Sequence, residues 1–425
     1  MPRLRFLLPL FAVSLAAGAS TARHVMPAES QDLVVHEWGT FTSMQGSDGV
    51  GLEGLQHEEE ALPPFVYSRT EVRECPLRQF GYKGLEMPLT GVTQKMETPV
   101  IYFHTDLPQR VRVRVDFIDG LLTQWFPVSD KLGPPEPPSA DDRLDLTQVA
   151  RSFLQWDIEL LPDAQTPVEV PWVPEEEPWD LARQVDAAWV RTLERPPGRM
   201  GPVEAERYLF YRGLGTFELP LTLRTGKRGS AVLSHDGLDE LPYALALEVR
   251  GDLARWAPLG EVLGGTERAL GLDREVLRPF DDVVAELKQD LHGALVDQGL
   301  FADEATAMIR TWSRSWFATE GMRLLYVVPS SLVEQVLPLT ITPEPDETVR
   351  VLVGRLEVMT PEVEASVERA LWDLEQGDET ERAAAVATLR ALDRFLEPHL
   401  RRTLTRSSSP IVRSAAQRWL DELSR

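Results

Sequence analysis

The sequence contains very little cysteine, because Cys75 is the only one among 425 residues. A single thiol excludes an intramolecular disulfide, so burial of apolar side chains has to stabilise the fold. We expect Cys75 itself to be a small buried or half-buried side chain. Long apolar runs are also missing: no stretch approaches the roughly 20 residues that a membrane-spanning helix needs. We therefore expect no membrane insertion of the mature chain.

Basic residues are outnumbered by acidic ones. The chain has 44 Lys and Arg against 67 Asp and Glu, which gives a formal net charge of -23. Such an excess of carboxylates repels phosphate backbones and anionic lipid. We expect neither nucleic acid nor a membrane surface as a partner, and the open candidates are an unknown protein or a carbohydrate.

The common catalytic motifs are absent as well. The sequence has no Gly-rich phosphate loop leading into a helix, no Gly-x-Ser-x-Gly nucleophile elbow, and no His-Glu-x-x-His or Cys-x-x-Cys spacing. We accordingly expect no cofactor and no metal. Function has to be sought in isolated polar and aromatic residues.

The first 22 residues have the three parts of a secretory signal peptide. Arg3 and Arg5 precede an apolar run over 6–16, and Ala17-Gly18-Ala19 fits the small-residue pattern that signal peptidase recognises. The apolar run is too short to span a bilayer as a helix. We expect a signal peptide over 1–22 and a mature chain exported to the periplasm or the cell exterior.

Residues 33–255 have the pattern of short strands separated by Gly, Pro and Asp. The clearest strand is 110–117, in which Val and Phe alternate with charged residues, as in a sheet with one buried face. Many short strands with tight turns favour an antiparallel β-sandwich, which we assign to 23–265. The Pro-rich segment 166–179 is expected to lie extended on its surface.

Helical periodicity appears after residue 266. Segment 280–298 and a second segment from Asp303 to Gly321 predict a helix pair, and strands return at 322–329 and 349–356. We therefore expect a region of mixed helices and strands, 266–359, packed on the sandwich.

The last region, 360–425, is expected to be helical throughout. Thr360 before Pro361 and Asp378 before Glu381 are typical of helix starts. The segment Ser409–Ala416 resembles the start of the second helix of a HEAT-type repeat. Since a solenoid needs about three repeats for stability, we expect this short HEAT-like tail to dock on the main body.

The most distinctive segment is His36-Glu37-Trp38-Gly39-Thr40. It resembles the opening of an uncharacterised family of exported bacterial proteins that share His-Glu-Trp-Gly-Thr near the mature N-terminus. The resemblance extends over most of the mature chain, including the segments 96–103 and 209–215, and it implies no activity.

His36 and Glu37 are neighbours on an expected strand and should therefore point to opposite faces. If Val35 faces the core, Glu37 does too, and a buried carboxylate requires a cationic partner, for which Arg212 or Arg323 are the candidates. Glu320 is expected at the negatively polarised end of a helix, where it either pairs with an arginine or binds a ligand.

Two further kinds of site remain open. His36, His57, His104 and His235 all fall in the strand-rich part, but no metal-ligand spacing connects them. Trp172 and Trp179 on the Pro-rich segment are the best candidates for an exposed aromatic pair that stacks on sugar rings.

The sequence thus favours an exported binding or scaffolding protein. The alternative is a hydrolase with a carboxylate- or metal-based site around His36, Glu37 and Glu320. An enzyme should bring these groups together in an accessible cleft, whereas in a binding protein each should be paired separately.

Overall fold

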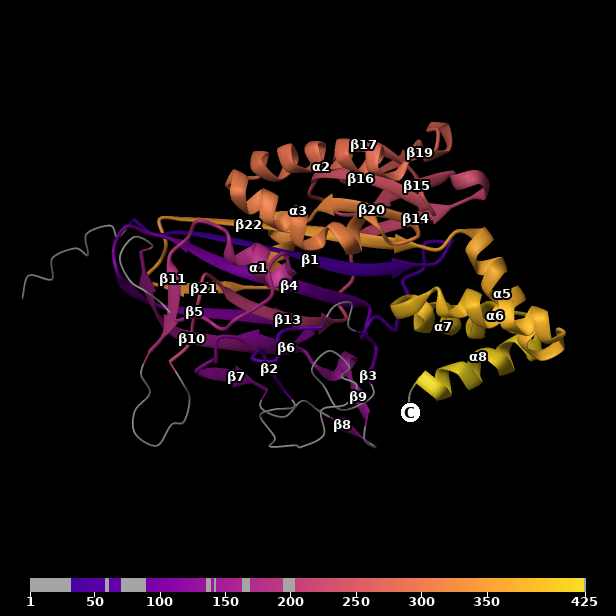
Figure 1. The fold of residues 1–425 in the computed structure, drawn as a ribbon, viewed down its shortest axis with the longest axis horizontal. Helices are drawn as coiled ribbons and strands as arrows, with labels where there is room; N and C mark the ends of the chain where they lie inside the picture. Colours follow the sequence, from indigo (N-terminus) through magenta and orange to yellow (C-terminus); the bar gives the residue numbers. More distant parts are fainter. Residues whose placement is uncertain are drawn as a thin grey trace, which may run out of the picture.

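The computed structural model describes residues 32–57, 61–69, 89–134, 139–140, 143–162, 169–193 and 203–423. The expected signal peptide and Cys75 lie outside the described residues. Within them, the fold combines several sheets with helices at the side and at the C-terminal end (Figure 1). The expected fold class, a β-rich body with a mixed segment and a helical tail, is confirmed.

A ten-stranded sheet forms the centre of the molecule. In spatial order its strands are β19 (Arg278–Pro279), β17 (Leu253–Val262), β16 (Leu241–Arg250), β20 (Gly321–Val327), β22 (Glu347–Val358), β1 (Val34–Gln45), β4 (Gln94–His104), β13 (Leu209–Gly215), β6 (Gly120–Phe126) and β2 (Tyr67–Ser68). All its pairs are antiparallel except the central pair of β1 and β22, which is parallel.

Smaller sheets lie around this centre. A six-stranded sheet contains β12 (Ala205–Glu206), β11 (Trp189–Thr192), β10 (Arg151–Leu161), β5 (Gln109–Ile118), β21 (Leu339–Thr342) and β7 (Lys131–Gly133). Two three-stranded sheets contain β14 (Leu221–Thr225), β15 (Ala231–His235) and β18 (Thr266–Ala269), and β3 (Leu89–Thr90), β9 (Arg143–Asp145) and β8 (Ser139–Ala140).

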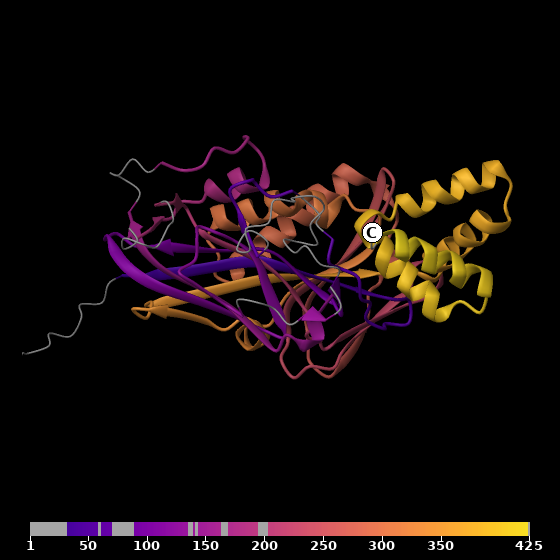
Figure 2. The same ribbon diagram turned by 90° about the horizontal axis from the view of Figure 1, so that it is seen from below.

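The ten-stranded sheet is covered on both faces. On one face, side chains of β1 and β4 share a hydrophobic core with those of β5 and β10, so the two larger sheets pack as a sandwich. On the other face, α1 (Pro178–Arg183), α2 (Phe280–Asp297) and α3 (Ala302–Phe317) bury their apolar sides (Figures 1 and 2). The strand β1 therefore lies between two layers and is buried along almost its whole length.

The expected boundary at residue 265 falls within this sheet. The strands β20 and β22 belong to the segment 266–359, yet they lie between β16 and β1 of the preceding segment. Outside this sheet the segment contributes the helices α2, α3 and α4 (Ser330–Val336) and the strands β18 and β21 of the smaller sheets. The division into domains remains a prediction, and the two segments share one sheet.

The tail is helical and docks on one end of the body (Figure 2). It contains α5 (Pro361–Gln376), α6 (Glu379–Arg390), α7 (Leu396–Arg406) and α8 (Pro410–Leu423), which share a core of their own. The Thr360 hydroxyl accepts from the Val363 amide, and Asp378 and Glu381 cap each other's backbone N–H, as predicted. No helix in the described part of the chain has both the length and the apolarity to cross a bilayer.

Candidate functional site

Glu37 lies between the two packed sheets. Its side chain is fully buried together with Val35, whereas Trp38 packs under the helices on the other face. The predicted division of His36 and Glu37 between opposite faces is thus confirmed. A buried carboxylate needs a cation or hydrogen-bond donors beside it, and Glu37 has both within the core.

The partner of Glu37 is Arg350, so the expected pairing with Arg212 or Arg323 is wrong. Arg350 lies directly opposite Glu37 in the parallel pair of β1 and β22, and its Nε donates to Glu37 Oε2 at 2.7 Å. The Tyr211 hydroxyl donates to the other carboxylate oxygen. Burial and the nearby Glu37 charge raise the pKa of Tyr211 well above its usual value, so it stays a neutral donor.

His36, on the helix-covered face, belongs to a different cluster. Its Nδ1 lies 2.6 Å from Glu304 Oε2, and His104 Nε2 lies 3.2 Å from Glu304 Oε1. The two histidines come from β1 and β4, and Glu304 lies in the first turn of α3. His36 and Glu304 are buried, whereas 15% of the His104 side chain is exposed.

Glu304 is held as a carboxylate in this cluster. Burial raises its pKa, but hydrogen bonds with His104 and His36 and the amide of Phe301 lower it more, so the pKa lies below its ordinary value. The Phe301 amide donates to Glu304 Oε2 at 2.8 Å. The Phe301 ring contacts both imidazoles, with centroid distances of 4.5 and 4.8 Å.

The other two candidate histidines lie elsewhere. His57 Nε2 is 2.9 Å from Glu397 of the tail, and His235 Nε2 is 2.6 Å from the Asp239 carbonyl. Of the four histidines considered from the sequence, only His36 and His104 come together.

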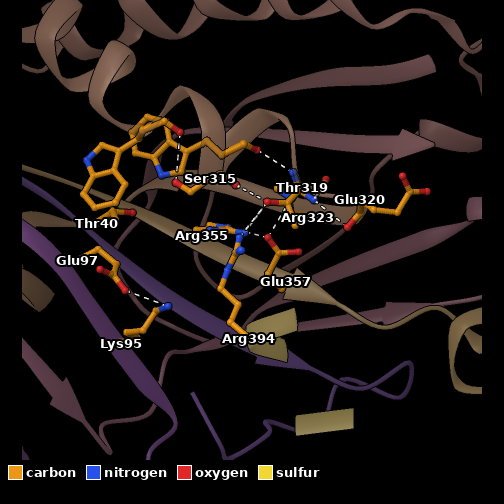
Figure 3. A network of polar contacts seen from close by, with 12 residues as sticks. Thr40, Lys95, Glu97, Ser315, Thr319, Glu320, Arg323, Arg355, Glu357 and Arg394 are labelled. Carbon is orange, nitrogen blue, oxygen red and sulfur yellow. Dashed lines mark hydrogen bonds and ion pairs between the residues drawn. The ribbon is translucent and has the colours of Figure 1, made fainter. Parts of the chain in front are cut away.

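Glu320 follows the C-terminal end of α3, and Arg323 lies on β20; Figure 3 shows both beside Arg355 and Glu357. Arg323 donates to the carbonyls of Trp316 at 2.8 Å and Glu320 at 3.2 Å, and it pairs with Glu357 at 3.0 Å. The exposed Glu320 carboxylate instead accepts from the Gly251 amide at 2.9 Å. His36, Glu37 and Glu320 are therefore paired separately, in three places.

A groove of about 440 Å³ separates this end of α3 from the tail, and His399 lies along it. His399 is buried, and its Nδ1 lies 2.7 Å from the Phe395 carbonyl. Burial lowers the pKa of His399 from 6.5 to about 4, outweighing the opposite effects of that carbonyl and of Glu364 and Glu357.

This shift predicts acid sensitivity. The unfolded chain takes up a proton at His399 near pH 6.5, whereas the folded chain resists protonation until about pH 4. Neutral His399 therefore contributes its full stabilisation of the fold above pH 6.5. As the pH falls from 6.5 toward 4, this contribution is lost, and the free energy of unfolding decreases by about 3 kcal/mol. Urea denaturation of the His399→Gln variant should show a pH dependence smaller by that amount. Parallel curves for variant and wild type would contradict the prediction.

A larger cleft of about 830 Å³ lies beside α1 and α3 and contains three predicted binding residues, Trp172, Trp179 and Arg212. Trp172 is 83% exposed, as expected. Trp179 is not: it is buried in α1, and its Nε1 donates to Glu206 at 2.7 Å, because the chain turns into a helix at Pro178. The expected exposed pair is thus a single exposed tryptophan.

The walls of this cleft carry several arginines. Arg310 of α3 pairs with Glu176 at 2.6 Å and so connects the Pro-rich segment to the helix. Arg212 lies 3.5 Å from Glu97. Arg314, one turn further along α3, forms no ion pair within the described residues.

Glu304 and Arg350 are the site residues that sequence reasoning missed. Glu304 looks like an ordinary acidic residue in the first turn of a helix, and Arg350 like the outward residue of a strand. The alternation of Arg350 with Val349 and Val351 predicted a strand. Nothing in the sequence indicated that Glu37 would be the partner of Arg350.

Comparisons with known proteins give no family. No family model matches the chain, and no curated protein matches it. Among 32 matching solved structures is a yeast delta-COP-I mu-homology domain complexed with a Dsl1 WxWxV peptide, at 6% sequence identity. The match covers 78% of this chain and 97% of that one, with a TM-score of 0.22. A likeness this low supports no inference about fold or ligand.

Proposed function

We propose that this chain is an exported binding protein whose ligand occupies the cleft beside Trp172, and that the ligand is a carbohydrate carrying a carboxylate. The observation that supports the proposal is Trp172 itself, 83% exposed at the edge of a cleft of about 830 Å³. A large aromatic side chain exposed next to a concave surface is typical of a binding site.

The charge of the cleft favours an acidic ligand. Among the described residues its lining has three arginines, Arg212, Arg310 and Arg314, and two carboxylates, Glu176 and Glu177. Arg310 pairs with Glu176 and Arg212 lies against Glu97, which leaves Arg314 as the lining arginine without an ion pair among the described residues. The guanidinium of Arg314 can bind a sugar carboxylate through two parallel hydrogen bonds.

Binding is a better account than hydrolysis because the candidate catalytic groups do not meet. Glu37 pairs with Arg350 inside the sandwich, whereas Glu320 lies at the opposite end of α3 from Glu304. None of them lines the cleft beside Trp172. The hydrolase alternative would need at least two such groups within reach of one bond.

The cleft is tested by titrating the protein with oligosaccharides of glucuronate and galacturonate and following tryptophan fluorescence. Trp172→Ala should weaken binding at least about tenfold, the equivalent of about 1.4 kcal/mol. Arg314→Gln should weaken binding of these acidic sugars but not of neutral ones.

The matched control is Trp372→Ala, which removes another exposed tryptophan from α5 in the tail. This variant should bind as the wild type does. If no oligosaccharide binds to the wild type, or if the two tryptophan variants lose the same affinity, the proposed function is wrong.

A further inference from the structure

Three side chains with metal-binding atoms meet at the start of α3. His36 of β1, His104 of β4 and Glu304 of α3 each contribute one ligand atom, and these atoms lie within 4.8 Å of one another. On the antiparallel pair of β1 and β4, His36 is opposite Tyr102 and His104 is opposite Val34, so the two imidazoles are diagonal neighbours.

The set of ligands fits a divalent transition metal. Two imidazoles and one carboxylate bind Zn²⁺ in tetrahedral sites, with bond lengths of about 2.0–2.2 Å. Ligand atoms around such an ion are about 3.3–3.5 Å apart by that geometry. His104 Nε2 lies 3.2 Å from Glu304 Oε1, and His36 Nδ1 lies 2.6 Å from the other oxygen, Oε2. One ligand atom from each residue lies within 4.8 Å of the other two, so small side-chain movements bring the three atoms to such distances.

The surroundings also fit an ion. Among the described residues no arginine or lysine pairs with the buried carboxylate of Glu304, whose partners there are the two histidines and the Phe301 amide. The hydrogen bond from the Phe301 amide holds the Glu304 carboxylate in place, as residues that support metal ligands do. The Phe301 ring covers both imidazoles, and the partly exposed edge of His104 gives access.

We propose that His36, His104 and Glu304 bind one divalent transition metal ion of the zinc class, which ties the start of α3 to β1 and β4. The ion takes the place of the hydrogens between the imidazoles and the carboxylate: a neutral imidazole then carries its hydrogen on the other ring nitrogen, and a protonated one releases a proton to the solvent. Neither the cleft beside Trp172 nor the groove beside the tail includes these residues. Three protein ligands leave a fourth position of the ion open, and water can take it at the partly exposed His104 edge.

The test uses the untagged full chain, because a histidine tag would bind metal itself. The protein is stripped with a chelator, exchanged into chelator-free buffer and titrated with Zn²⁺ by calorimetry, and with Co²⁺ by visible absorption. We expect one ion per chain, a tetrahedral Co²⁺ spectrum and a melting temperature that rises with the concentration of Zn²⁺.

Two variants remove one ligand each. Glu304→Gln preserves the shape of the side chain, and His104→Ala changes a side chain that is partly exposed and so requires little repacking. Each should weaken Zn²⁺ binding more than about 100-fold, because even the loss of a residue that merely supports a ligand costs 10- to 100-fold.

The controls are Asp303→Asn, in the same turn of α3, and His292→Ala, a half-buried histidine of α2. Both should bind Zn²⁺ as the wild type does, and so should Trp172→Ala, because the metal site is independent of the cleft. The proposal is overturned if the wild type binds no stoichiometric metal, or if Glu304→Gln and His104→Ala bind it as tightly as the wild type.

Discussion

Replacing Arg350 with methionine is expected to lower the free energy of unfolding by about 3–5 kcal/mol. The variant leaves the carboxylate of Glu37 buried between the two sheets without a cation, and Tyr211 is its remaining hydrogen-bond donor among the described residues. An uncompensated charge in such a place is far more destabilising than the loss of a surface ion pair. Equilibrium unfolding in urea, followed by tryptophan fluorescence, measures the difference.

The double variant Glu37→Leu, Arg350→Met is the matched control. It removes both charges and should recover most of the loss, because a buried ion pair contributes little beyond what apolar side chains of similar size provide. Tyr211→Phe removes only one hydrogen bond to the carboxylate and should cost about 1.5–3 kcal/mol. If the double variant were less stable than Arg350→Met alone, the buried charge could not be the cause.

The elements with one buried face were predictable from the sequence. In β5 the valines and Phe117 face the core, as the alternation over 110–117 indicates, because one face of that sheet is covered by the core and the other is open. The helices α2 and α3 were found by their periodicity, and α5 and α6 by their caps.

The central strands were harder to interpret. Because β1 and β22 lie between two layers, both of their faces are buried and alternation is lost. Their parallel pairing joins residues about 300 positions apart, as from Glu37 to Arg350. Nothing in the local sequence specifies that register, so the partner of Glu37 could not be predicted.

The same limit applies to the histidine cluster. Motif spacing detects ligands that share a helix or a turn. His36, His104 and Glu304 instead lie on three elements, with 268 positions between the first and the last. By contrast, the exposure of Trp172 was predictable because it is a property of a single position on a Pro-rich segment. Arg212 was expected only as a partner of Glu37, which pairs with Arg350 instead.

The second large effect is expected at the C-terminal end of α3. Arg323→Met should lower the free energy of unfolding by about 3–5 kcal/mol, because this fully buried guanidinium both pairs with Glu357 and binds carbonyls that the helix leaves without amide partners. Figure 3 shows how these contacts gather beside Thr319 and Glu320. Urea denaturation measures the loss, and hydrogen exchange of the amides in the last turn of α3 should show that it begins there.

The variant Arg323→Lys keeps the positive charge of the side chain and removes the planar guanidinium. An ammonium group can neutralise Glu357, but it lacks the planar fork that reaches several acceptors at once, so this variant should recover only part of the loss. The surface control is Arg310→Met on α3, whose ion pair with Glu176 is exposed and should contribute no more than about 1 kcal/mol. Equal destabilisation by Arg323→Met and Arg310→Met would mean that the buried arginine does not hold the end of α3 on the sheet.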